Sequence, residues 1–317
     1  MDRRRFLAAA ALAAVSPAAL ARAAGGTPIA LVTADLEGYV AALNLSSGRV
    51  EKGIRVAPGP QSIQSSLGRR ALVGHPDEGV VTVIDAVPLR VAHVLRGFGE
   101  PRYAVATPGG LNAILADAGR EELATIDLVR GRVLRRTPVG GPARHLAMAP
   151  DGRSIWVALG TKAERIAVVS VERDALPVRF LQPPFPAHDV AFTPRGGSVW
   201  VTSGDRGEVA VYDSRTLRLR RRLFAHAPPQ HVAFLGDLAF VTSGEAGTLR
   251  VHRVRDGALV RTVRVPEGTY NVATGWGVVF APSLSQGTLA VVDDRGRPRR
   301  VVHVARSSHD ACYVVAA

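Results

Sequence analysis

Short apolar stretches alternate with polar turns along most of this chain, and they come in groups of four. One group contains AHDVAF (residues 187–192), VWVTS (199–203), EVAVYD (208–213) and the arginine-rich LRLRRRL (217–223). Runs of this length bounded by glycine, proline and aspartate predict β-strands, and helical periodicity is almost lacking after the first 23 residues. The chain is therefore expected to be all-β.

The group of four strands repeats along the chain. The residue before the first apolar pair of each repeat, called the leading residue below, recurs every 39 to 44 positions. The leading residues are Ser62, Tyr103, His145, Asp189, His231, Asn271 and Asp310. Four short strands per repeat of about 40 residues are typical of a β-propeller.

Counting strands predicts seven blades. Six complete units begin near residues 60, 101, 142, 186, 229 and 269. Residues 29–56 supply three more strands, and residues 309–315 supply one that aligns with the first strand of the other units. We expect these N-terminal and C-terminal strands to form a seventh blade together, which covers two sheet edges. The predicted propeller domain spans residues 24–317.

Several motifs resemble a known repeat family. The stretches WVTS (200–203) and FVTS (240–243), the Pro-Asp-Gly turn at 150–152 and the V-x-D ending at 211–213 are similar to YVTN repeats of YncE-like, WD40-like propellers. The resemblance implies that the leading residues lie at one mouth of the central channel. It also implies that the loops between second and third strands open on the same face. Propellers of this kind serve many roles, so the resemblance predicts the fold and not the function.

The first 23 residues predict an export signal. MDRRRFL (1–7) precedes an alanine-rich run that ends at residue 21, and Ala21-Arg22-Ala23 offers a cleavage site. The arginines followed by Phe-Leu resemble a twin-arginine signal, and an ordinary secretory signal is the alternative. Both predict a periplasmic or extracellular protein. The apolar run is too short for a good spanning helix, so we expect no membrane span in the mature chain.

The basic composition does not predict a nucleic-acid partner. Lys and Arg number 40 against 27 Asp and Glu, which gives a net charge of +13, but the arginines are dispersed. On a strand such as 217–223, charges discourage edge-to-edge aggregation, and we expect a monomer. The single cysteine, Cys312, cannot form an intrachain disulfide and is expected to pack as a small buried hydrophobe.

Polar residues concentrate at the predicted channel mouth, which is the usual kind of place for ligand binding. The rim residues expected to bind a ligand are Tyr103, Arg144, His145, His188, Asp189, His231, Asn271, His309 and Asp310. Imidazole and carboxylate groups are also the ligands of divalent metal ions. The sequence thus raises the hypothesis of a metal held by His145, Asp189, His231 and Asp310, with a water-filled polar mouth as the alternative.

Three functions remain open at this point. The first is a binding or scaffold protein that holds a protein partner or small ligand at the rim, and it is favoured because no complete catalytic motif occurs. The second is a metal-assisted hydrolase or lyase, since similar propellers include lactonases and a lyase that acts on cyclic lactone antibiotics. The third is an accessory protein for a periplasmic cofactor or redox enzyme. The sequence does not name the ligand or decide whether the protein is an enzyme.

Overall fold

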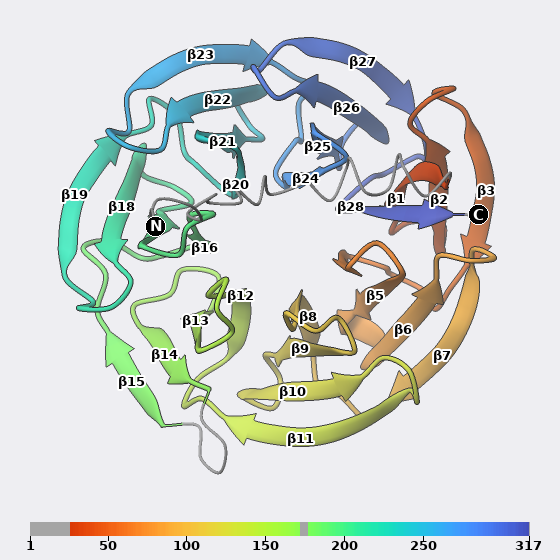
Figure 1. Ribbon diagram of the computed structural model, residues 1–317, viewed down its shortest axis with the longest axis horizontal. Helices are drawn as coiled ribbons and strands as arrows, with labels where there is room; N and C mark the ends of the chain where they lie inside the picture. Colours follow the sequence, from red (N-terminus) through yellow and green to blue (C-terminus); the bar gives the residue numbers. More distant parts are fainter. Residues whose placement is uncertain (1–25, 172–176, 317) are drawn as a thin grey trace, which may run out of the picture.

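Seven four-stranded antiparallel sheets form a ring in the computed structural model (Figure 1). The structure describes residues 26–171 and 177–316, so the predicted export signal lies outside the described residues. The sheets are the blades of a seven-bladed β-propeller, as predicted, and the first strand of each blade lies nearest the centre of the ring.

The blades are numbered here in chain order from the first complete unit. Blade 1 contains β4 (Ser62–Ser66), β5 (Arg70–His75), β6 (Val80–Asp85) and β7 (Arg90–Arg96), with a 3-10 turn η1 (Pro76–Glu78). Blade 2 contains β8 (Pro101–Ala106), β9 (Asn112–Asp117), β10 (Glu122–Asp127) and β11 (Arg132–Pro138). Blade 3 contains β12 (Ala143–Met148), β13 (Ser154–Leu159), β14 (Ile166–Ser170) and β15 (Val178–Leu181).

Blades 4 to 6 repeat the same order. Blade 4 contains β16 (Val190–Phe192), β17 (Ser198–Thr202), β18 (Glu208–Asp213) and β19 (Leu219–Phe224). Blade 5 contains β20 (Val232–Leu235), β21 (Leu238–Ser243), β22 (Thr248–Arg253) and β23 (Leu259–Arg264). Blade 6 contains β24 (Ala273–Gly275), β25 (Val278–Ser283), β26 (Thr288–Asp293) and β27 (Pro298–His303).

Blade 7 joins the two ends of the described chain. It contains β28 (Ala311–Ala316), β1 (Thr27–Ala34), β2 (Tyr39–Asn44) and β3 (Val50–Arg55). Antiparallel pairing runs from Thr27 opposite Ala316 to Val32 opposite Ala311. The predicted closure of the ring is confirmed, and it pairs β1 on both edges and β28 on one.

Large aromatic side chains fill the space between blades. Trp156, Trp200, Phe240 and Phe280 occupy the same place in the second strands of blades 3 to 6, and each is fully buried. Each pairs across its sheet with an alanine of the first strand, which leaves room for a large ring. Trp156, for example, joins a cluster with side chains of the next blade. The other three aromatics likewise join clusters that contain residues of the next blade.

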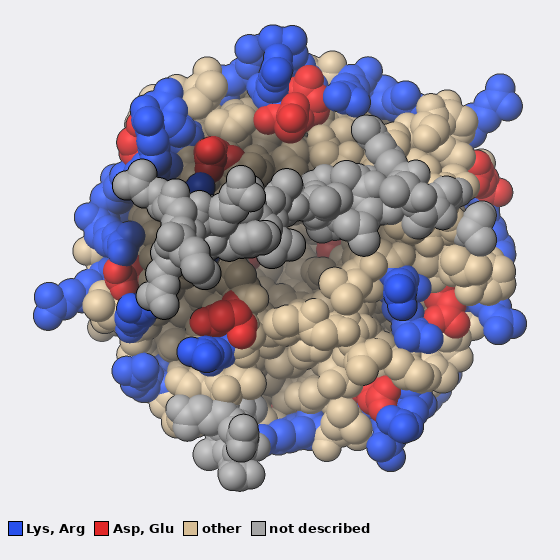
Figure 2. Space-filling view, viewed as in Figure 1, with Lys and Arg blue, Asp and Glu red and all other residues tan. Residues whose placement is uncertain are grey.

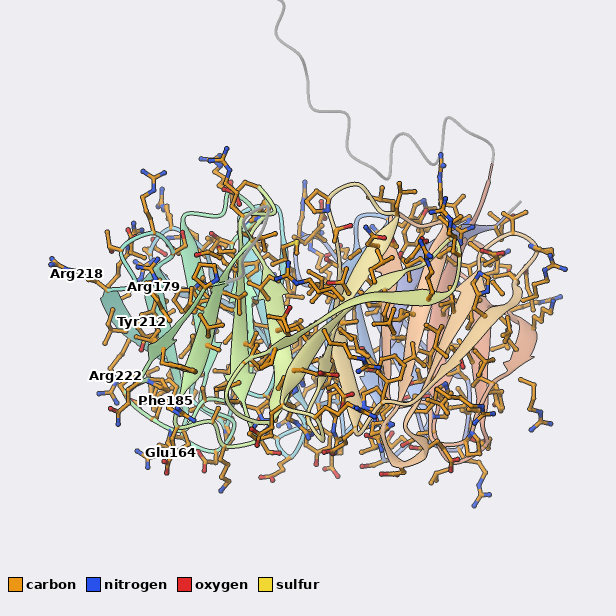
Figure 3. The ribbon with its side chains drawn as sticks, turned by 90° about the horizontal axis from the view of Figure 1, so that it is seen from below. Glu164, Arg179, Phe185, Tyr212, Arg218 and Arg222 are labelled. Carbon is orange, nitrogen blue, oxygen red and sulfur yellow. The ribbon has the colours of Figure 1, made fainter. Side chains whose placement is uncertain are left out.

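The outer strands carry the positive charge. β3, β19 and β27 are mostly exposed, and Lys and Arg surround the outer edge of the face seen in Figure 2. In the edge-on view of Figure 3, Arg218 and Arg222 lie at this outer edge, far from the ring centre. The charges are therefore spread around the ring.

The segments that lead into the innermost strands share one face with the loops between second and third strands. Figure 3 shows Phe185, which precedes β16, and Glu164, in the loop between β13 and β14, on the same flat side. Ala163 and Ala187 in these two segments form an isolated antiparallel bridge. Within the described residues, no helix has the length and apolar character needed to cross a membrane.

Candidate functional site

Two β-bulges direct side chains of blades 2 and 3 toward the ring centre. In blade 2, Arg102 and Tyr103 lie between the paired residues Pro101 and Ala104, where the register of β8 with β9 shifts. In blade 3, the register of β12 with β13 shifts in the same way between Ala143 and Leu146. A bulge places two residues opposite one and changes the direction of their side chains. Two consecutive residues, Arg144 and His145, can thus both contribute to the site.

The threonine of the repeated VT motif fixes the leading residues of blades 4, 5 and 7. Its buried hydroxyl oxygen accepts the backbone N–H of the leading residue in the same blade. The donor and acceptor pairs are Asp189 with Thr202 at 3.0 Å, His231 with Thr242 at 3.2 Å and Asp310 with Thr33 at 2.9 Å. The motif that identified the repeat in the sequence therefore also positions the site.

Three histidines from successive blades meet at the ring centre. His145 lies in β12, His188 precedes β16 and His231 precedes β20. One ring nitrogen from each can be chosen so that all three lie within 4.8 Å of one another. In a tetrahedral zinc site, nitrogens at 2.0–2.1 Å from the metal lie roughly 3.3 Å apart. Small side-chain movements would therefore convert this cluster into a three-nitrogen metal site.

Partners of the other ring nitrogens orient two of the three histidines. The Nδ1 of His188 lies 3.3 Å from the carbonyl oxygen of Thr161, and the Nδ1 of His231 lies 3.3 Å from Asp189 Oδ2. An Nδ1–H donated to these oxygens leaves Nε2 as the free lone pair in both rings. Such outer hydrogen bonds fix the tautomer of metal-binding histidines and raise their basicity.

Gly204 allows His188 to take its place. It has a φ of +77°, and a Cβ at this position would lie 2.8 Å from the Cβ of His188. A residue with a side chain would be strained there and would also push the imidazole away.

His145 is the least satisfied member of the cluster. It is only 1% exposed, yet neither ring nitrogen has a hydrogen-bond partner among the described residues. Burial, followed by the neighbouring His188 and His231, lowers the pKa of His145 well below its usual value. The pKa of His188 is lowered to about 4, first by burial and then by His231. Both rings are therefore neutral near pH 7, as metal coordination requires.

Tyr103 closes one side of the cluster. Its ring centroid lies 4.3 Å from that of His145 and 5.5 Å from that of His231. Its hydroxyl reaches toward blade 6 and donates a 3.4 Å hydrogen bond to Asn271 Oδ1. The amide of Asn271 in turn donates to the carbonyl oxygen of His309 at 2.8 Å. Burial raises the pKa of Tyr103, so its phenol stays protonated.

The carboxylates of Asp189 and Asp310 have a different role from the three histidines. Asp189 accepts the backbone N–H of Val190 at 2.8 Å and that of Val232 in the next blade at 3.2 Å. Asp310 does the same with Ala311 at 2.8 Å and with Ile63 of blade 1 at 3.0 Å. Each leading aspartate thus links two neighbouring blades. Asp189 also contacts His231, whereas the oxygens of Asp310 do not belong to the histidine cluster.

The four-ligand set expected from the sequence therefore divides. His145 and His231 come together, and the third side chain that lies close to both is His188. The sequence placed His188 on the rim but outside the metal set, because it stands one position before the leading residue. A search for histidines at either of the two positions in neighbouring blades would have found it.

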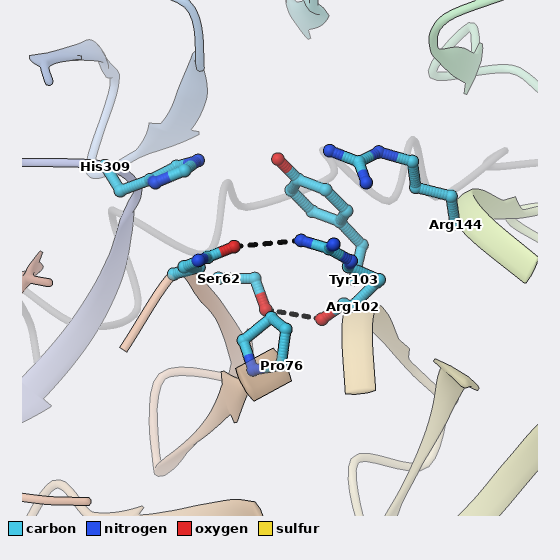
Figure 4. Close-up of a pocket in the computed structure, with 7 residues that line it drawn as sticks. Ser62, Pro76, Arg102, Tyr103, Arg144 and His309 are labelled. Carbon is cyan, nitrogen blue, oxygen red and sulfur yellow. Dashed lines mark hydrogen bonds between the residues drawn. The ribbon is translucent and has the colours of Figure 1, made fainter. Parts of the chain in front are cut away.

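A small pocket lies beside the cluster, with room for about one water-sized group. Figure 4 shows its lining residues, among them Arg102, Tyr103, Arg144 and His309. Arg102 donates to Gln61 Oε1 at 2.9 Å and is paired with Glu100. His309 Nδ1 lies 3.6 Å from Asp35 Oδ2. Tyr103 belongs to both the pocket and the histidine cluster, so the two are adjacent.

Two solved structures are similar in fold to this chain. No protein-family model matches the chain, and no curated protein matches it by sequence. The Kuenenia stuttgartiensis hydrazine synthase structure is similar, with 15% identity, a TM-score of 0.73, and coverage of 83% of this chain and 91% of that chain. A functionally unknown protein from Desulfotomaculum acetoxidans DSM 771 is also similar, with 12% identity, a TM-score of 0.75, and coverage of 90% and 98%. At these identities the likeness supports the fold alone, which is that of a seven-bladed β-propeller.

Proposed function

We propose that this β-propeller is a metal-binding protein that holds one divalent transition-metal ion through His145, His188 and His231. The observation that carries the proposal is the cluster of three imidazoles, in which buried His145 has no hydrogen-bond partner for either ring nitrogen among the described residues. A buried polar group without a partner is costly, so the arrangement is understandable if a ligand satisfies it.

The chemistry of the cluster defines the class of ion. Three imidazole nitrogen ligands suit Zn²⁺, Co²⁺, Ni²⁺ or Cu²⁺, whereas Mg²⁺ and Ca²⁺ prefer oxygen ligands. The carboxyl oxygens of Asp189 and Asp310 already accept backbone N–H groups. We therefore place Asp189 in the outer shell of the metal, behind His231.

A propeller with such a site fits a general binding role. The predicted export signal supports a location outside the cytoplasm, where the protein would hold the metal itself or use it to hold a ligand. Three protein ligands also leave a coordination position open, as in catalytic zinc sites, so the hydrolase or lyase hypothesis is retained as a second candidate. Binding is favoured because both nearby carboxylates are engaged in links between blades.

Metal titration of the chelator-treated protein, prepared without a histidine tag, tests the proposal. We expect one Co²⁺ per chain, with visible absorption bands of a low-symmetry site, and displacement by Zn²⁺. A metal present at 100 times its Kd should raise the free energy of unfolding by about 2.7 kcal/mol. Substitution His188→Ala or His231→Ala should weaken binding at least 100-fold.

His303→Ala is the matched control, because His303 is exposed on the outer strand β27. It should bind Co²⁺ as the unchanged protein does. The proposal is wrong if no stoichiometric Co²⁺ binding occurs, or if the cluster variants bind as tightly as His303→Ala.

A further inference from the structure

An unpaired arginine lies next to the histidine cluster. Arg144 is half-buried in the β-bulge directly before His145. Among the described residues, its guanidinium forms neither a hydrogen bond nor an ion pair, and its Nε is fully buried. Figure 4 shows this side chain extending toward the Tyr103 ring at the top of the pocket. An arginine with donors directed into a pocket needs an acceptor.

Arg102 provides an internal comparison. It occupies the matching bulge of blade 2 and lines the same pocket, but Gln61 and Glu100 already accept its hydrogen bonds. The charge of Arg102 is thus offset by a neighbouring carboxylate, while Arg144 has no such ion pair within the part of the chain that the structure describes. The two arginines differ in whether a protein acceptor is present, and this difference identifies Arg144 as the group available to a ligand.

The charges around the cluster favour an anion. A histidine that coordinates a metal through its imidazole is a neutral ligand, so three such ligands would not reduce the double charge of a bound metal ion. The carboxylates of Asp189 and Asp310 are each held by two backbone N–H groups and are not directed at Arg144. A metal ion and Arg144 would therefore leave positive charge at the ring centre with no described side chain bonded to Arg144 to offset it.

We infer that Arg144 and the metal ion together bind the carboxylate group of a small ligand. This inference rests on the proposed metal site. One carboxylate oxygen would occupy the open position of the metal, and the other would accept hydrogen bonds from the guanidinium, whose planar fork matches a carboxylate. The pocket has room for about one water-sized group, so a carboxylate is closer to its size than a bulkier phosphate ester is.

Acetate titration of the Co²⁺-loaded protein tests the inference. Visible absorption is followed at saturating Co²⁺, and sodium chloride of equal ionic strength serves as the salt control. We expect a saturable change in the Co²⁺ bands with acetate and a much smaller one with chloride. Arg144→Gln should weaken acetate binding at least 10-fold, and Arg144→Lys should weaken it less, because the charge remains but the fork is lost.

Two further arginine variants complete the design. Arg102→Gln should have a smaller effect than Arg144→Gln, and Arg218→Gln, at the outer edge of the ring, should behave as the unchanged protein. Melting curves establish that each variant is folded, and Arg144→Lys replaces Arg144→Gln if the latter is not. Metal affinity is measured for each variant, so that acetate binding is always compared at full Co²⁺ occupancy.

The outcomes separate the two proposals. If no Co²⁺ bands form, the metal site is wrong and the inference falls with it. If the bands form but acetate leaves them unchanged, or if Arg144→Gln binds acetate as tightly as Arg218→Gln, only the inference is overturned. Equal acetate affinity with and without Co²⁺, measured by calorimetry, would also overturn it, because the ligand is inferred to contact the metal.

Discussion

Two buried histidines in this ring have opposite surroundings. His75, at the end of β5 in blade 1, is fully buried, and both its ring nitrogens are bonded, to the carbonyl oxygen of Pro58 and the hydroxyl of Thr82, each at 3.0 Å. His145, in β12 of blade 3, is almost as buried but has no hydrogen-bond partner for either ring nitrogen among the described residues. Burial alone therefore does not distinguish structure from function.

The same contrast extends to the regions around these residues. Blades 7 and 1 are joined by Asp310, whose two oxygens accept backbone N–H groups from both blades. Blades 2 to 5 instead present Tyr103 and three histidines to one another, in ring contacts of 4.3 to 5.5 Å. The first region holds the ring together, and the second leaves nitrogen lone pairs available for a ligand.

Removal of the C-terminal strand should have the largest effect. A chain ending at Ser308 lacks Asp310 and the whole of β28, whose six residues all pair with β1. We expect the truncated protein to be largely unfolded at room temperature and to show no cooperative melting transition. Blades 7 and 1 would lose their link through Asp310, and β1 would have an open edge. Thermal melting and far-ultraviolet circular dichroism measure this. A truncated protein that melts like the full chain would show that closure is unimportant.

Alanine substitution of each of these two histidines should separate a contribution to stability from a contribution to metal binding. His75→Ala is expected to lower the free energy of unfolding by about 2–4 kcal/mol, because Thr82 and the Pro58 carbonyl lose their partners, with metal affinity retained. His145→Ala should weaken metal binding at least 100-fold and cost less stability in the metal-free protein. Denaturant unfolding and Co²⁺ titration of both variants test the contrast, which is broken if the two behave alike.

Substitution of the two leading aspartates, Asp189 and Asp310, should have similar effects on stability but different effects on metal binding. Asp189→Asn and Asp310→Asn each replace an acceptor of two backbone N–H groups, so each should lower stability by about 1–3 kcal/mol. Only Asp189 contacts a histidine of the cluster. Asp189→Asn should thus weaken metal binding 10- to 100-fold, and Asp310→Asn should leave it unchanged. Equal metal affinity in both variants would remove Asp189 from the outer shell.

Lowering the pH should reduce the free energy of unfolding of the metal-free protein, by less than the substitutions above do. Burial lowers the pKa of His75 and of His252, a second buried histidine in blade 5. Below the ordinary histidine pKa of about 6.5, the unfolded chain binds protons that these folded side chains do not, so stability falls as the pH falls. Denaturant midpoints at pH 7 and pH 5 measure the loss, and His75→Gln should reduce it. A denaturant midpoint that is higher at pH 5 than at pH 7 would contradict the assignment of this acid sensitivity to His75 and His252.

Much of the fold could be predicted from local pattern. The leading residues recur at regular intervals, and the four-strand groups give blade number because each blade repeats the same strand lengths and turns. The pairing of β28 with β1 followed from counting strands, since an incomplete unit at each end must be completed. The VT motif was also recognisable in the sequence. The sequence did not show that the threonine hydroxyl of this motif accepts the backbone N–H of the leading residue.

The site could be predicted only in part. Tyr103, His145, His188 and His231 were placed at one mouth of the ring, because a repeat puts equivalent positions at equivalent places. The partition of these residues into roles was not predictable. Asp189 and Asp310 resemble ligands in the sequence, but hydrogen bonds to the following residue and to the next blade decide their orientation. Conversely, the conformation at Gly204 and the segment before β16 bring His188 inward.

The sequence by itself thus determined an all-β ring of seven blades, its closure and the positions that surround its centre, because strand periodicity and repeat length are local properties. Only the tertiary structure decided which polar groups at the centre are satisfied by backbone N–H groups and which are not. That distinction depends on distances between blades roughly 40 residues apart in the chain, and on bulges at Arg102 and Arg144 that change side-chain direction. The same tertiary contacts leave the ring nitrogens of His145 and the guanidinium of Arg144 without hydrogen-bond partners among the described residues, and the proposed metal and carboxylate sites follow from them.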